Sequence, residues 1–227
     1  RFYIPISGNL KIIVKDAVHF LPVSVHQSIT YHAGGKHTVT EAEICLVFSE
    51  IKAGYLQIQA GGAMKAISAL ITATGVDLDV KDLGLLSECE VFEKQIVFQG
   101  KEKWHGGSNS SVDKYYNAMV VPTVINAGSL KAVVDGKSKI EAAQILVEYD
   151  SIIQSKDDLT LLSKYNVHLH DSVSKKSYMF QCHEGKLKVA GTKTVREHFY
   201  GESPVPTIYY SGGNFYGSSD GKIHLLG

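Results

Sequence analysis

The chain has 227 residues, and 23 Lys and Arg against 23 Asp and Glu give a formal net charge of +0 at pH 7. This balance excludes attraction of the whole molecule to nucleic-acid phosphate or to acidic lipid, so either ligand would need a local basic patch. No apolar run approaches the roughly 18 residues of a membrane-spanning helix, and no basic end followed by an apolar stretch marks a signal peptide. We therefore expect a soluble protein without a membrane span.

Cysteine usage indicates the compartment. Cys45, Cys89 and Cys182 are far apart and form no C-x-x-C pair, which is typical of reduced thiols rather than of a disulfide framework. We expect the cytoplasm or another reducing compartment. The first residue is Arg rather than Met, which indicates a processed product, a fragment or a trimmed chain, and leaves a viral origin open.

The beginning of the chain is predicted to form strands. Residues 9–14 are apolar and β-branched, and residues 24–32 alternate between two faces. Gly34-Gly35 is predicted to be a two-residue hairpin turn, which would place His32 opposite His37. Such a pair could bind a metal, or repel when both rings are protonated, and the alternative is a solvated surface pair.

Three helices are predicted further along the chain. The first begins at the capping box of residues 40–43, and the second begins at the capping box of residues 138–141. Apolar residues follow each box at helical spacing. The third is predicted over residues 63–74, after Gly61-Gly62 and before Gly75, which would end it.

Short matches suggest an internal duplication. Gly8-Asn9-Leu10-Lys11 recurs as Gly128-Ser129-Leu130-Lys131, the two capping boxes match each other, and residues 82–87 recur as residues 158–163. The predicted fold is a β-rich α+β fold with two related strand–helix–strand units packed as a pseudo-symmetric pair. We place the N-terminal α+β unit at residues 1–106 and the β-rich C-terminal α+β unit at residues 107–227.

Residues 167–185 are the candidate metal site. If residues 165–171 form a strand, His168 and His170 lie on one face, and a turn around residues 172–176 would return residues 178–183 against it. His183, or Cys182 in its place, could then supply a third ligand for a zinc-like ion. The alternative is an exposed polar hairpin without a metal.

Residues 175–200 are the candidate nucleic-acid site. Basic residues alternate there with aromatic residues, a pattern that suits a polyanion backbone and stacked bases. The candidate contacts are Lys175, Lys176, Lys186, Lys188 and Arg196. An ordinary hairpin with outward lysines and inward aromatic rings accounts for the same pattern.

The favoured function is a non-catalytic structural protein that self-associates through β-rich surfaces as a homo-oligomer. The apolar segment 223–226 supports this, because a terminal strand must pair either with its own sheet or with the next subunit. The alternatives are an RNA- or single-strand-binding protein using residues 175–200, and a metal-dependent enzyme using His168 and His170. No G-x-S-x-G or H-E-x-x-H motif gives a reason to name an enzyme.

Overall fold

The computed structural model describes residues 2–5, 8–101, 107–178, 181–183, 186–188 and 191–226. Within these residues every regular element is a β-strand. The predicted α+β fold class is therefore wrong, because the described chain is all-β. Most strands belong to two sheets, a 13-stranded sheet of parallel pairs and a 6-stranded antiparallel sheet.

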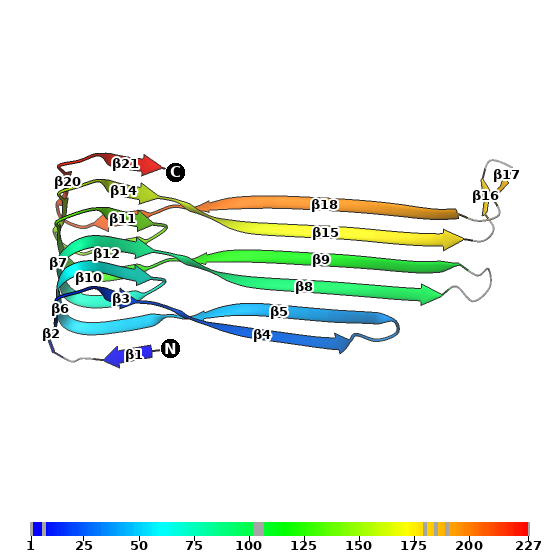
Figure 1. The fold of residues 1–227 in the computed structure, drawn as a ribbon, viewed down its shortest axis with the longest axis horizontal. Helices are drawn as coiled ribbons and strands as arrows, with labels where there is room; N and C mark the ends of the chain where they lie inside the picture. Colours follow the sequence, from blue (N-terminus) through cyan, green and yellow to red (C-terminus); the bar gives the residue numbers. More distant parts are fainter. Residues whose placement is uncertain are drawn as a thin grey trace.

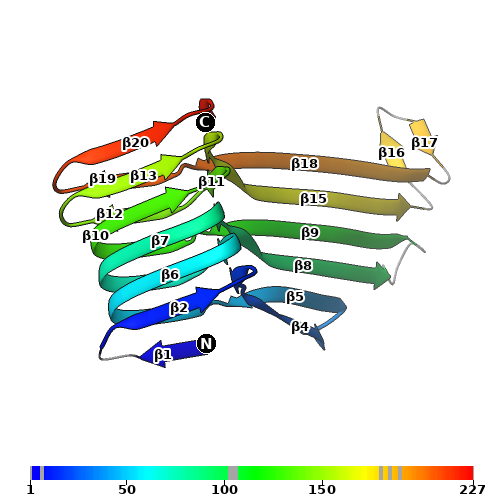
Figure 2. The same cartoon turned by 60° about the vertical axis from the view of Figure 1, so that its left-hand side comes forward.

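The 13-stranded sheet winds into six stacked coils, which we call the coil stack (Figures 1 and 2). Each coil has three segments separated by two corners, and each segment pairs in parallel with the same segment of the next coil. The coils in chain order are coil 1, β1 (Phe2–Pro5), β2 (Leu10–Val14) and β3 (Val18–Phe20); coil 2, β6 (Ser49–Ile67); coil 3, β7 (Leu70–Leu86); coil 4, β10 (Val124–Val134) and β11 (Ser138–Glu141); coil 5, β12 (Gln144–Val147), β13 (Ser151–Ser155) and β14 (Leu159–Leu162); and coil 6, β19 (Ile208–Ser211), β20 (Phe215–Ser219) and β21 (Ile223–Leu226).

The antiparallel sheet projects from one side of the coil stack, and we call it the fin (Figure 1). It consists of three hairpins in the strand order β18-β15-β9-β8-β5-β4. A separate pair, β16 (Gln181–His183) and β17 (Lys186–Lys188), lies at the tip of the third hairpin. The fin strands are β4 (Val23–His32), β5 (His37–Val47), β8 (Glu88–Lys101), β9 (Ser108–Val121), β15 (Lys164–Tyr178) and β18 (Gly191–Val205).

Each coil is joined to one strand of the fin. Coil 1 leads into β4 and β5 leads into coil 2, and the hairpins β8–β9 and β15–β18 link coils 3 and 4 and coils 5 and 6 in the same way. Neighbouring strands lie about 4.8 Å apart in any sheet, so a two-stranded hairpin rises by the same height as two coils. The spacing of the strands in the fin therefore matches the spacing of the coils along the described chain.

The inward side chains of all three segments form one hydrophobic core. In coil 2, Leu56, Ile58 and Met64 are 0% exposed, and the outward Lys52 and Lys65 are exposed. This period of two is the pattern of a strand with one buried face. The largest fully buried side chains come from the four middle coils: Leu56, Ile58, Met64, Ile71, Val76, Leu78, Val80, Leu85, Ile125, Ile140, Ile145 and Ile153.

The three predicted helices are wrong, and the first lies on the fin. Thr40 and Ala42 face one side of β5, and Glu41 and Glu43 face the other. The carboxylate of Glu41 does not cap a helix, because its Oε1 lies 2.7 Å from Nζ of Lys94 on the neighbouring β8. A pairing that is distant in sequence has overridden the local capping pattern.

The other two predicted helices cross turns between coils. Ile140 and Ile145 both point into the core, but they belong to β11 and β12 and a turn separates them. Residues 63–74 likewise run from the end of β6 into β7. A turn shifts the phase of two alternating strands, which produces apolar spacings that resemble a helical period.

The internal repeat is a single coil rather than an α+β unit. Leu10 and Leu130 occupy equivalent register positions in coils 1 and 4, and Leu83 and Leu159 do so in coils 3 and 5. Two of the three sequence matches therefore mark repeated coils. The match between the capping boxes does not, because residues 40–43 lie in the fin and residues 138–141 lie in the coil stack.

The predicted boundary between residues 106 and 107 falls between β8 and β9, which are paired neighbours in the fin. The core of the coil stack contains residues from both sides of this boundary.

Among the residues that the structure describes, no helix has the length and apolar character needed to cross a membrane.

Candidate functional site

Strand β15 carries two of the predicted metal ligands. His168 and His170 share one face of it, and Nδ1 of His168 lies 2.9 Å from Oδ1 of Asn117. The ring of His170 stacks on Tyr115 with a centroid distance of 4.3 Å. The predicted turn at residues 172–176 is wrong, because β15 continues to Tyr178 and pairs with β18.

The third predicted ligand, His183, lies in β16 at the tip of the fin. Its side chain, like that of Cys182, lies outside the described residues. Within the described part of the chain, no three His, Cys, Asp or Glu side chains are grouped so that they could hold a metal ion. The zinc-like site with His168, His170 and His183 stays a prediction.

The loop of the first hairpin has three residues, residues 34–36, rather than the predicted two. Gly34 and Gly35 both have positive φ, 65° and 61°, which confirms the predicted turn at these glycines. His32 faces Thr38, however, and lies 3.3 Å from its hydroxyl, whereas the ring of His37 packs against Phe98. The predicted pairing of His32 with His37 is wrong, because a three-residue loop places the two rings on opposite faces of the fin.

The predicted nucleic-acid contacts are divided between the faces of the fin. Lys175 and Arg196 lie on one face, and Lys176 lies on the other, directly opposite Lys193. The side chains of Lys186 and Lys188, on β17, lie outside the described residues. Successive side chains of a strand point to opposite faces, so a run of basic residues is divided between the two faces of the fin. Nucleic-acid binding stays a prediction.

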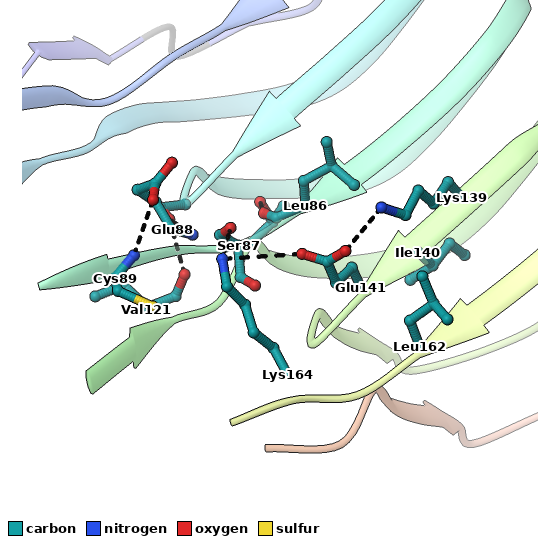
Figure 3. A network of polar contacts seen from close by, with 12 residues as sticks. Leu86, Ser87, Glu88, Cys89, Val121, Lys139, Ile140, Glu141, Leu162 and Lys164 are labelled. Carbon is teal, nitrogen blue, oxygen red and sulfur yellow. Dashed lines mark hydrogen bonds and ion pairs between the residues drawn. The ribbon is translucent and has the colours of Figure 1, made fainter. Parts of the chain in front are cut away.

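A polar network ties the fin to the coil stack (Figure 3). Nζ of Lys164 donates to the carbonyl oxygen of Ser87 at 2.7 Å and lies 3.9 Å from Oε1 of Glu141. Glu141 also pairs with Lys139 at 2.8 Å. Because these residues come from coil 4, from the junction between coil 3 and β8, and from the third hairpin, the network fixes where that hairpin leaves the coil stack.

Two cysteines lie on the fin, and neither is activated. Burial raises the pKa of the Cys89 thiol. A hydrogen bond to Glu43 is the main cause that raises the pKa of Cys45. Both thiols are therefore kept protonated, which is the opposite of what a nucleophilic cysteine needs.

The corners of the coil stack are held by aspartates that cap the next coil. Asp82 Oδ1 accepts a hydrogen bond from the backbone N–H of Lys137 at 2.9 Å, and Asp158 Oδ1 accepts one from Lys222 at 3.0 Å. The Lys222 N–H, with a contribution from the positive charge of Lys137, holds the pKa of Asp158 below its ordinary value. Each capped coil therefore depends on a carboxylate of the coil before it.

The Asp158 cap should make stability depend on pH. A carboxyl group whose pKa is lower in the folded state stabilises that state above its unfolded pKa of about 3.9, and the contribution is lost as the pH falls. We expect Asp158→Ala to be less stable than the native chain at pH 7, with the difference shrinking towards acid. Denaturant unfolding at several pH values measures this, and a difference that does not change with pH would contradict it.

The two ends of the coil stack are open. In the described residues, β2 and β3 of coil 1 pair only with β6, and the strands of coil 6 pair only with those of coil 5. The outer edges of the fin, β4 and β18, are also paired on one side only. Both ends therefore present rows of backbone donors and acceptors to a further strand.

The open end at coil 6 also exposes the end of the core. Phe215, Ile223 and Leu225 occupy inward register positions, yet their exposed fractions are 48%, 52% and 71%. The equivalent inward residues of coil 5 are buried or half-buried. Apolar side chains that the next coil would cover are therefore exposed to solvent at this end.

Sequence reasoning identified segment 223–226 as a strand needing a partner, but it did not identify the open coil as a whole. The sequence signal that could have revealed the coil is the recurrence of Gly8–Lys11 at residues 128–131, because this match marks repeated coils rather than larger units. No protein-family model, curated protein or solved structure matches this chain.

Proposed function

We propose that the protein is a structural protein that self-associates through the open ends of its coil stack. The observation that carries the proposal is the exposure of inward core residues on coil 6, next to a strand edge without a partner. Burial of apolar surface contributes about 25 cal/mol per Å², and the backbone edge supplies directional hydrogen bonds. Repeat proteins that stay monomeric usually close such ends with a polar terminal repeat.

The strands of coil 6 lack the usual protection of an exposed edge. Natural edge strands are commonly protected by Pro, by charged side chains or by bulges. The sequences of β19, β20 and β21 are IYYS, FYGSS and IHLL, with neither Pro nor Asp, Glu, Lys or Arg. This composition favours pairing of the edge over its protection.

The test is the mass of the protein in solution over a wide range of concentration, by sedimentation or light scattering. We expect association that grows with concentration, with stacked particles visible by electron microscopy and a strand spacing of about 4.8 Å along their axis. A strictly monomeric native chain at high concentration would refute the proposal.

Charged side chains on coil 6 should prevent association without preventing folding. We expect the double variant Ile223→Lys and Leu225→Lys to remain monomeric, because both positions are more than half exposed in the monomer but would be covered in an assembly. The matched control is Tyr149→Lys, at an exposed corner of coil 5 with 67% exposure. Equal association of the double variant and the control would contradict the proposed site.

A further inference from the structure

Building on the proposed function, we infer that the partner is a second copy of this chain, stacked head to tail in one register. Coil 1 of the second copy lies on coil 6 of the first, and β4 of the second copy pairs with β18 of the first. Strand direction, the register of both sheets and the charges at one corner of coils 3 to 6 together set the polarity and the register of this stack.

Strand direction selects head-to-tail stacking. Neighbouring coils are parallel throughout the coil stack, and neighbouring strands are antiparallel throughout the fin. Strand β18 runs towards the coil stack and β4 runs away from it. Placing coil 1 on coil 6 therefore continues both patterns at once, whereas joining two like ends would make the coils antiparallel.

One register suits the coils. The inward positions of the middle segment form columns through the stack, and one such column contains Leu10, Leu56, Val76, Leu130, Ser151 and Phe215. The next member of this column is Leu10 of the second copy. The same step places Phe20 of the second copy on Leu225, so that exposed apolar side chains of coil 6 meet apolar side chains of coil 1.

The same register suits the fin. Its rows run straight across the strands, and one row is Ile29, Glu41, Lys94, Tyr115, His170 and Phe199. Continuing this row places Ile29 of the second copy beside Phe199, and these side chains are 58% and 61% exposed in the monomer. One placement of the second copy thus continues the strand pairing of both sheets, although one sheet is parallel and the other antiparallel.

Charged residues at one corner of the coil stack favour the same stacking register. The residue that follows the middle segment is Lys81 in coil 3, Asp135 in coil 4, Lys156 in coil 5 and Asp220 in coil 6. Nζ of Lys156 lies 2.5 Å from Oδ1 of Asp135. The hydrogen bond and the negative charge of Asp135, with a smaller contribution from Asp220, raise the pKa of Lys156. The residue at this position in coil 1 is Lys15, so the stacked second copy would place a positive charge beside Asp220.

Cross-linking of two single-cysteine variants tests the register. In the inferred stack Ser218 lies beside Ile13 of the second copy, and both residues are exposed and outward in the monomer. Adjacent strands hold Cα atoms within the range of about 4.4–6.8 Å that a disulfide spans. The variants Ser218→Cys and Ile13→Cys are made in a background with serine at the three native cysteines.

We expect a disulfide-linked dimer when the two variants are mixed under oxidising conditions, and none from either variant alone. The control is Lys11→Cys, which is outward on the same strand but displaced by two residues, and which should not link to Ser218→Cys. Linking of Ser218→Cys to itself would show joined like ends and would overturn the inference. Stacks that sediment as large particles without the expected dimer would overturn the register but leave the proposed function standing.

Charge reversal gives an independent readout. We expect Asp220→Lys alone, or Lys15→Asp alone, to weaken association by several-fold to about tenfold, because each places like charges together at the junction. The double variant should recover association, since it restores an opposite pair. Equal association of all four proteins would overturn the inferred contact, whereas a monomeric native chain would refute the proposed function itself.

Discussion

Leu78→Ala is expected to lower the free energy of unfolding by about 2–5 kcal/mol. Leu78 lies on the inward face of coil 3 and is 1% exposed, with a coil above it and a coil below it. The substitution removes apolar contacts and leaves a cavity that the paired strands on both sides cannot close. Denaturant unfolding followed by circular dichroism measures the loss.

The matched control is Leu146→Ala, which makes the same chemical change on an outward position of coil 5. Leu146 is 38% exposed, so we expect a loss below about 1 kcal/mol. Equal losses at Leu78 and Leu146 would contradict the assignment of inward and outward faces, because that assignment depends on the alternation of each strand.

Gly128→Ala is expected to lower the free energy of unfolding by at least about 2 kcal/mol. A Cβ atom at Gly128 would lie 2.3 Å from the backbone carbonyl oxygen of Thr74 in the coil before it. The backbone carbonyl cannot move aside without disturbing the parallel pairing of β7 with β10. Thermal or denaturant unfolding of the variant measures the effect.

Gly8→Ala is the control for Gly128→Ala, because Gly8-Asn9-Leu10-Lys11 and Gly128-Ser129-Leu130-Lys131 are matching corners. A Cβ atom at Gly8 would have no heavy atom within 4 Å, since no described coil precedes coil 1. We expect a change below about 0.5 kcal/mol for a surface substitution of this kind. A large loss at Gly8 would mean that the two corners are not equivalent.

The fin and the coil stack achieve stability in different ways. The coil stack encloses a core, whereas the fin is a single sheet whose long strands run beyond the stack (Figure 2). Its side chains support one another across strands, as in the ion pair of Glu41 with Lys94 and the stacked rings of Tyr115 and His170. Such cross-strand pairs contribute about 0.2–1 kcal/mol each, so the fin depends on the coils that hold its hairpins in step.

Part of this architecture could be predicted from local sequence. The alternation of residues 24–32 predicted a strand, and β4 (Val23–His32) confirms it. The apolar residues 9–14 predicted the strand found as β2, and Gly34-Gly35 predicted the turn that their positive φ values confirm. These features follow from the preferences of a few neighbouring residues, which the sequence states directly.

The sequence did not reveal which strands would pair in parallel and which would pair in hairpins. Residues 40–43 and 138–141 carry the same capping pattern, yet one became a fin strand and the other a segment of coil 4. The lone pattern predicted a helix in both cases, because a capping box describes only local hydrogen bonds. Partners on other strands satisfied the same backbone groups instead.

The candidate site was likewise predicted only in part from the sequence. The apolar segment 223–226 showed by itself that a strand near the C-terminus needs a partner. Only the tertiary structure placed Phe215, Ile223 and Leu225 together at an open end of the core. Only the register of the six coils showed that Asp220 and Lys15 follow equivalent positions of coil 6 and coil 1. Strand alternation is local and can be read from a sequence, but parallel register joins residues far apart in the chain and is decided by packing of the folded stack.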